Sequence, residues 1–269
     1  MRIETLSDHP GALLADAVGA RQRGGPAGQD AALNEAISDR DQARAGRRWL
    51  TWLRLIFAVR RERRELARQR LSSQQSAGRV ESIRAGGNAE QVVAEQLSRA
   101  LSDDWTLFSG YRNRRGEIDG VLVGPTGVFA YEVKYYNATV FIAGDDWQLE
   151  RFDKYGNQVS DRTPMGDKRG RSPSAQLNQP VAALTDWLAK RGHPVTVTAV
   201  VLLTHDRARI GSSRNATVRV ETSVQGLLSL TKQSPATLNA KQRTEIGQII
   251  RDDHQHHNQP RPTTRPGRG

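Results

Sequence analysis

The sequence contains no cysteine among its 269 residues. The protein therefore forms no disulfide bond, and it offers neither a thiolate metal site nor a cysteine nucleophile. The first residues, MRIETLSDHPGALLADAV, carry charges throughout and lack the apolar core of a secretory signal. Together these two features favour a cytoplasmic protein.

Long apolar runs are also lacking. The longest one, residues 49–59 (WLTWLRLIFAV), is interrupted by Arg54. A helix of this length rises about 16 Å, whereas the hydrocarbon layer of a bilayer is about 30 Å thick. This segment is therefore too short to span a membrane.

Positive charge is abundant, because the formal net charge is +11. Residues 40–70 hold eleven arginines and three acidic residues, a net +8, and residues 251–269 contribute +2. The remainder of the chain is close to neutral. Such an excess of positive charge indicates a polyanionic partner. Because the excess lies mainly in residues 40–70, we expect this segment, an N-terminal arm, to make the contact.

The arm is predicted from composition. Residues 1–46 are rich in Ala, Gly, Gln and Asp without strong periodicity, so we expect them to be largely disordered or loosely helical. Residues 47–71 are predicted to form a basic amphipathic helix, and residues 72–85 a linker. Four arginines of this helix are candidates for binding nucleic acid: Arg60, Arg61, Arg63 and Arg64. A helix on an anionic membrane surface, a helix that docks on a partner and a helix packed on the protein itself fit the pattern equally, and the sequence leaves these alternatives open.

Residues 86–232 have the texture of one mixed α/β domain. A helix is expected from Asn88, a suitable N-cap, to residue 100. A second helix is expected over 172–193, with Pro180 kinking or breaking it. A C-terminal helix at 233–253 and a disordered tail at 254–269 follow, and the histidines of the tail are interpreted as flexible rather than metal-binding. Strands are predicted at 105–109, 117–123, 128–135, 139–142, 147–151 and 195–204, and a short helix near 223–230. This order predicts a mixed central β-sheet flanked by helices.

Residues 116–134 (GEIDGVLVGPTGVFAYEVK) have the pattern of a β-hairpin closed by Gly124 and Gly127. Paired residue numbers in a symmetric hairpin have a constant sum, here 251. Asp119 and Glu132 satisfy that sum, so their Cβ atoms are expected to lie about 5 Å apart across the strands.

The charged face of the hairpin allows two interpretations. Two facing carboxylates repel unless a cation lies between them, and Mg²⁺ is commonly bound through one or two carboxylates. Lys134 shares their face, and the same sum pairs it with Glu117. A solvated ladder of charges is the alternative, and spacing alone favours that ladder. The other face is expected to be the core face: Ile118, Leu122, Phe129, Tyr131 and Val133. The charged face also carries apolar residues and is expected to be half apolar, as in a cleft: Val121, Val123, Val128 and Ala130.

The hairpin resembles the central signature of the nuclease-related domain (NERD) family, a branch of the PD-(D/E)xK nuclease superfamily, with Gly120 where that family commonly has histidine. Three further motifs are similar, in the same order. GNAEQVVAEQL resembles the opening helix with its acid at Glu90, DDWQ at 145–148 resembles the Trp-containing hairpin, and Pro173 and Gln176 match the later Pro-x-x-Gln. The resemblance covers about residues 84–232.

The resemblance implies a restriction-endonuclease-like core and a divalent-metal-dependent nuclease that acts on nucleic acid, in the first place DNA. It implies that Asp119, Glu132 and the Val133 carbonyl hold Mg²⁺ or Mn²⁺, and that Lys134 orients the attacking water. Glu90 would reach the metal through a water, and Gln176 would orient water or phosphate. A catalytically weak or inactive module that binds nucleic acid or protein is the alternative. The near-neutral core leaves it open, while the complete set of Asp119, Glu132 and Lys134 favours the enzyme.

Overall fold

The computed structural model describes residues 1–22, 37–38, 81, 83–153 and 155–258. The chain divides into one unit of Met1–His9 with Gly86–Gly269 and a second unit of Pro10–Ala85. Both sheets and all the site residues described below belong to the first unit. The predicted basic helix 47–71 lies entirely outside the described residues, and so does most of the predicted linker 72–85. The arginines predicted to bind nucleic acid are therefore not described: Arg60, Arg61, Arg63 and Arg64.

The first residues of the chain form a strand, which the prediction of a disordered or loosely helical segment did not include. Strand β1 (Arg2–Thr5) pairs in parallel with β2 (Thr106–Asn113), and helix α1 (His9–Gln22) follows. The Arg251 guanidinium forms an ion pair with Glu4 at 2.8 Å. The prediction was wrong here because a short, mostly exposed edge strand is ordered by its neighbour and has no apolar alternation of its own.

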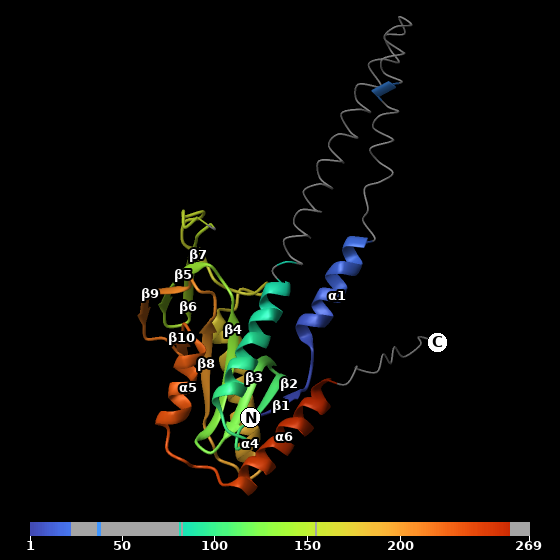
Figure 1. The fold of residues 1–269 in the computed structure, drawn as a ribbon, viewed down its shortest axis with the longest axis vertical. Coiled ribbons are helices and arrows are strands. Elements are labelled where there is room, and N and C mark those ends of the chain that lie inside the picture. Colours follow the sequence, from blue (N-terminus) through green and yellow to red (C-terminus); the bar gives the residue numbers. More distant parts are fainter. Residues whose placement is uncertain (23–36, 39–80, 82, 154, 259–269) are drawn as a thin grey trace, which may run out of the picture. The chain divides into compact units, whose positions relative to one another are not determined.

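The central sheet has the strand order β1-β2-β3-β4-β8-β10 (Figure 1). Strands β3 (Gly116–Gly124) and β4 (Gly127–Lys134) form the predicted hairpin, and β2 is antiparallel to β3. Strands β8 (Val197–Leu203) and β10 (Arg219–Glu221) extend the sheet in parallel beyond β4. The predicted mixed sheet is therefore confirmed.

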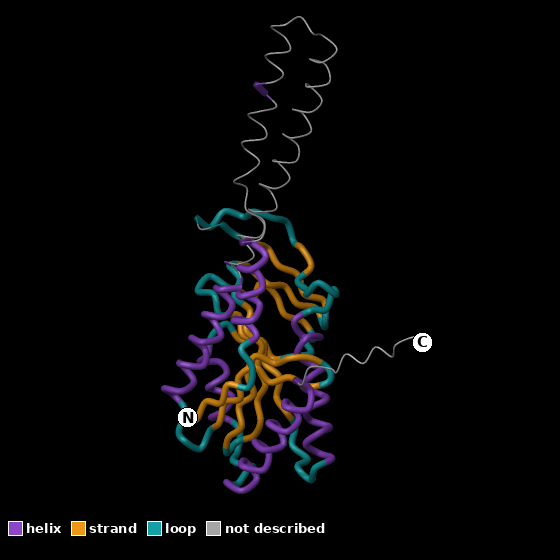
Figure 2. Tube along the Cα trace, turned by 90° about the vertical axis from the view of Figure 1, so that its right-hand side faces the viewer, coloured by secondary structure: helices purple, strands orange, loops and turns teal. Residues whose placement is uncertain are grey.

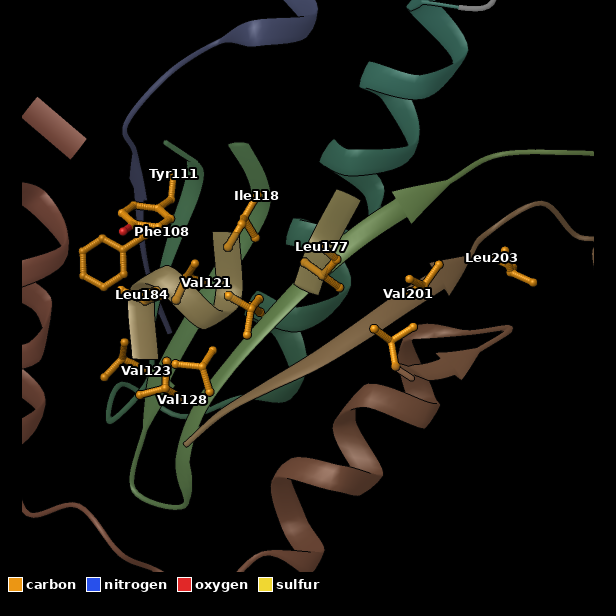
Figure 3. Close-up of a cluster of buried hydrophobic side chains, with 14 of the residues drawn as sticks. Phe108, Tyr111, Ile118, Val121, Val123, Val128, Leu177, Leu184, Val201 and Leu203 are labelled. Atoms are coloured by element: carbon orange, nitrogen blue, oxygen red, sulfur yellow. The ribbon is translucent and has the colours of Figure 1, made fainter. Parts of the chain in front are cut away.

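Helices cover both faces of this sheet, as Figure 2 shows in side view. The helix of residues 83–100 and α5 (Val224–Gln233) cover one face, and α4 (Pro173–Lys190) and α6 (Ala240–Asn258) cover the other. The first core includes Val93, Leu97, Leu122, Phe129, Tyr131 and Leu227. The second includes Ile246 and the residues Val121, Val123, Val128, Leu177 and Leu184 that Figure 3 labels. This is the α/β, restriction-endonuclease-like architecture that was predicted.

A smaller sheet has the order β7-β6-β5-β9. Its hairpin of β5 (Ala138–Ala143) and β6 (Asp146–Arg151) was predicted, whereas β7 (Thr163–Pro164) and β9 (Arg209–Arg214) were not. All residues of β9 are exposed, so no apolar pattern signals this strand. Trp147 of β6 is fully buried and donates from Nε1 to Ser174 Oγ at 3.1 Å, which fastens this sheet to the start of α4.

Several helix boundaries differ from the predictions. The first helix of the domain is already helical at residue 83, so Asn88 is not its N-cap. Helix α4 continues through Pro180, whose carbonyl accepts a hydrogen bond from Asn113 Nδ2 at 2.8 Å. None of the helices in the described ranges is long and apolar enough to cross a bilayer.

Helix α6 runs to Asn258, so the first part of the predicted tail is helical. His254 is buried in this helix and accepts a hydrogen bond from the Arg112 main-chain N–H at 3.1 Å. Burial lowers the pKa of His254 below its usual value. Its interpretation as a flexible tail residue was wrong, because its role depends on a distant strand that the local sequence does not reveal.

Candidate active site

The β3–β4 hairpin opens into a fork at the end remote from its turn. The register runs from Gly124↔Gly127 to Gly120↔Tyr131, which confirms the predicted sum of 251. Beyond that pair, β3 remains paired with β2 and β4 remains paired with β8, so the two strands diverge (Figure 3). Asp119 and Glu132 are the residues that follow the last pair. They lie at the mouth of the fork. The sequence predicted that they form a ladder pair, and they do not.

Asp119 spans the fork with its side chain. Its Oδ2 accepts a hydrogen bond of 2.7 Å from the Val133 main-chain N–H, so a carboxylate replaces the missing strand partner. Within an extended strand, the N–H and C=O of one residue point to the same side. The Val133 carbonyl is therefore directed towards the fork rather than towards β8.

The strand alternation also shifts at Asp119. The β2–β3 register keeps one offset from Ser109↔Gly120 to Tyr111↔Ile118, but the pair between them, at Gly110 with a φ of +68°, is missing. Ile118 belongs to the same core as Val121, although both strict alternation and our prediction placed them on opposite faces.

The face predicted to be half open is in fact core. Its four apolar residues are buried in the core that α4 and α6 share: Val121, Val123, Val128 and Ala130. The prediction of a cleft along this face was wrong, because the covering helices are distant in the sequence. The polar site is limited to the fork.

Lys134 is held by two partners at the fork. Its Nζ donates to Glu132 Oε1 at 2.7 Å and to Gln176 Oε1 of α4 at 3.2 Å. The predicted pairing with Glu117 is wrong, because the strands have separated at that level. Glu117 instead accepts hydrogen bonds from Arg112 at 3.0 Å and from Ser7 at 3.2 Å.

A loop ahead of α4 orients Gln176. The Gln176 amide donates from Nε2 to the Arg171 carbonyl at 2.7 Å, which turns its oxygen towards Lys134. Asp167 fixes this loop, since its carboxylate accepts from the Arg171 main-chain N–H and from Arg171 Nε, both at 2.9 Å. The sequence analysis missed Asp167 and Arg171, although an Asp-centred turn just before a helix start is a recognisable signal.

Burial and mutual repulsion govern the ionisation of the site. The Glu132 and Lys134 side chains are only 12% and 16% exposed. Burial, followed by the charges of Glu132 and Glu90, raises the pKa of Asp119 well above its usual value. Burial, followed by the charges of Glu132 and Glu117, raises the pKa of Glu90 to about 7. Three mutually repelling carboxylates therefore share this site.

The pKa of Lys134 is also raised, but for an ammonium group this shift favours the charged form. Burial alone would lower the pKa of Lys134, but the carboxylates of Glu132 and Asp119 outweigh it and raise the pKa above its usual value. Lys134 therefore stays charged at neutral pH. One positive charge among three carboxylates leaves the site negative when all of them are ionised, which favours an added cation.

Gly120 makes room for an aromatic ring beside the carboxylates. A Cβ at residue 120 would lie 2.2 Å from Cζ of Tyr131, whose side chain is fully buried. Residue 120 is where the NERD family commonly has a histidine. In this protein the ring of Tyr131, from the opposite strand, occupies the space of a side chain at that position.

The donor groups fit a divalent cation that completes its shell with water and substrate. In the part of the chain that the structure describes, no group of three or more acidic or histidine side chains is placed so that it could hold a metal ion by itself. Mg²⁺ usually takes one or two carboxylates and keeps several waters. The Asp119 and Glu132 carboxylates and the Val133 carbonyl directed into the fork are oxygen donors of the kind that Mg²⁺ takes.

Comparison with known proteins gives one match. Residues 85–204 match the family model described as the nuclease-related domain, NERD. The matched range contains all five predicted catalytic residues: Glu90, Asp119, Glu132, Lys134 and Gln176. No curated protein and no solved structure matches the chain.

Proposed function

We propose that this protein is a divalent-metal-dependent nuclease that hydrolyses phosphodiester bonds in nucleic acid, in the first place DNA, because residues 85–204 match the family model of the nuclease-related domain. The observation that carries the proposal is the fork between β3 and β4. It brings the carboxylates of Asp119 and Glu132 and the ammonium group of Lys134 to one place, with Gln176 hydrogen-bonded to the lysine.

Asp119, Glu132 and the Val133 carbonyl are the groups that we assign to Mg²⁺ or Mn²⁺. A cation bound there would lower the pKa of a bound water and offset negative charge in the transition state. The raised pKa values of Asp119 and Glu90 support the assignment, because this cluster of carboxylates is costly to ionise without a cation.

Lys134 is assigned to the attacking water and to the phosphate oxygens. Its ammonium remains charged at neutral pH, and hydrogen bonds to Glu132 and Gln176 limit its movement. A charged donor fixed in advance stabilises developing negative charge without reorganisation. With a pKa of about 7, Glu90 is able to hold or release a proton near neutral pH.

The polyanionic substrate accounts for the charge distribution of the sequence. The net +8 of residues 40–70 would supply electrostatic affinity for phosphates, while the fork itself is acidic. In this proposal Arg60, Arg61, Arg63 and Arg64 bind the backbone outside the site. Cysteine is missing throughout, which supports a cytoplasmic location.

The experiment is a cleavage assay with the full-length protein and end-labelled single- and double-stranded DNA and RNA. The wild type is expected to cut with Mg²⁺ or Mn²⁺ and not with EDTA. Asp119→Ala and Lys134→Ala are expected to lose at least about 100-fold in rate, whereas Asp186→Ala, on the exposed face of α4, keeps it. A wild type that cuts none of the substrates, or variants that cut equally well, would reject the enzyme and favour the binding-module alternative.

A further inference from the structure

Two exposed aromatic residues follow the lysine of the fork directly. The side chains of Tyr135 and Tyr136 are 43% and 37% exposed. In contrast, Trp105, Tyr111, Phe129, Tyr131 and Trp147 of the same domain are buried. Neighbouring rings left in water at the edge of a site point to a ligand that covers them.

The ends of two parallel strands create the first half of this surface. Lys134 of β4 pairs with Leu203 of β8, and the Thr204 N–H donates to the Lys134 carbonyl at 3.1 Å. The carboxyl ends of parallel neighbours meet at the same edge of a sheet. His205 therefore lies beside Tyr135, with 4.8 Å between ring centroids and 54° between ring planes.

Tyr136 and Arg151 form the second half. Arg151, at the end of β6, lies over the Tyr136 ring with 5.8 Å between its Cζ and the ring centroid. Tyr136 follows Lys134 by two residues, directly after β4 ends. Tyr136 therefore borders the fork itself.

The segment that follows His205 is basic. Residues 206–214 contain three arginines and a single aspartate, and β9 within this range is exposed along its whole length. β9 pairs with β5, which begins two residues after Tyr136. Positive charge therefore follows His205 in the chain and lies on the strand next to β5, where it matches a phosphate backbone.

We propose that Tyr135, Tyr136, His205 and Arg151 form a stacking surface for unpaired bases of a single-stranded nucleic acid that enters the fork. The proposal rests on the proposed function, since it names the substrate class of the same site. Aromatic side chains stack on every base, and arginine adds a cation–π contribution. In a duplex the base faces are covered by their neighbours, so this surface favours unpaired strands.

The test measures binding without cleavage. Fluorescence anisotropy in EDTA would compare the full-length protein on labelled single strands of DNA and of RNA, about 20 nucleotides long, and on the matching DNA duplex. Tyr135→Ala/Tyr136→Ala is expected to weaken single-strand binding about 5- to 100-fold. Duplex affinity, which depends on phosphate contacts, is expected to change by less than about twofold.

The matched control is Tyr135→Phe/Tyr136→Phe, which keeps both rings and removes both hydroxyl groups. It is expected to bind single strands like the wild type. His205→Ala and Arg151→Ala, with smaller losses, repeat the test without altering either tyrosine. Thermal unfolding of each variant shows whether it is folded, and the phenylalanine variant decides the outcome if the alanine variant is not.

Three results would overturn the stacking surface: unchanged single-strand binding, an equal loss on the duplex, or a phenylalanine variant as weak as the alanine variant. The DNA and RNA arms show which strand is preferred. A protein that binds single strands through the tyrosines but never cuts would refute the proposed function alone. A protein that cuts while its tyrosine variants bind normally would refute the stacking surface alone.

Discussion

The two ends of the β3–β4 hairpin differ in what holds them together. At the turn, Val123 faces Val128 in an unbroken ladder, and both side chains are buried. At the fork the ladder has ended, and a carboxylate of β3 bonds to a main-chain N–H of β4. The same two strands therefore provide a packed core at one end and charged groups at the other.

The two ends of the hairpin contribute differently to the free energy of folding. The turn end gains from burial of apolar side chains. The fork end collects carboxylates whose pKa values are raised by burial and by one another. Concentrating charge at a strand end, where main-chain partners are already missing, confines the cost to a few residues.

Alanine substitution of two glycines, one at each end of the hairpin, is the test with the largest expected effect on stability. A Cβ at Gly120 in the fork would lie 2.2 Å from the Tyr131 ring, and a Cβ at Gly124 near the turn would lie 2.2 Å from the Trp105 ring. Gly120→Ala and Gly124→Ala are each expected to lower the free energy of unfolding by about 1–3 kcal/mol, measured by urea denaturation.

Activity should separate these two variants. Gly120→Ala displaces a ring next to Asp119 and is expected to slow cleavage per folded molecule, whereas Gly124→Ala is not. If Gly124→Ala slowed cleavage as much as Gly120→Ala, the division of the hairpin into a structural end and a functional end would be wrong.

The pH dependence of stability is the next test, through Glu90→Gln. The usual pKa of this carboxyl is 4.5 and the folded protein raises it to about 7. The folded state thus holds the proton more tightly, so the contribution is complete below pH 4.5 and is lost as the pH rises through 7. The glutamine variant lacks this loss.

Unfolding free energies without metal provide the measurement. Relative to the wild type, Glu90→Gln is expected to be more stable at about pH 8 than at about pH 5. A difference between the two proteins that stays constant over this range would show that Glu90 is not held among the other carboxylates.

The smallest effect is expected for Asp167→Ala in the loop before α4. Its loss frees the Arg171 carbonyl that orients Gln176, so kcat is expected to fall roughly threefold to tenfold with KM little changed. Asp153→Ala is the matched control, because Asp153 likewise accepts hydrogen bonds from the N–H groups of Tyr155 and Asn157 but has no contact with Gln176.

Non-additivity shows whether Asp167 acts through Gln176. Once Gln176→Ala is present, adding Asp167→Ala should cause no further loss of rate. A full additional loss in the double variant would assign Asp167 a separate role.

The sequence predicted the hairpin well because its signals are local. The Gly-Pro-Thr-Gly turn and the alternation on both sides determine the register, and the sum of 251 holds up to Gly120↔Tyr131. The resemblance to the nuclease-related domain was confirmed over residues 85–204. It pointed to Glu90 and Gln176 as candidate site residues, which spacing alone did not single out.

The sequence failed where distant partners decide the structure. The fork opens because β3 keeps β2 while β4 keeps β8, and β8 lies more than 60 residues further along the chain. The same limit concealed β1, whose order comes from β2, and His254, whose partner is Arg112. Local periodicity does not contain these pairings.

Cation binding at the fork is the most direct test of the proposed metal site. Titration of the full-length protein with Mn²⁺, followed by electron paramagnetic resonance, is expected to show saturable binding that Mg²⁺ displaces and that weakens as the pH falls, because protons compete for the carboxylates. Asp119→Asn and Glu132→Gln are expected to weaken it at least about tenfold, while Asp186→Asn does not. Equal Mn²⁺ affinity in the wild type and both fork variants would contradict the assignment of Asp119 and Glu132 as the metal ligands.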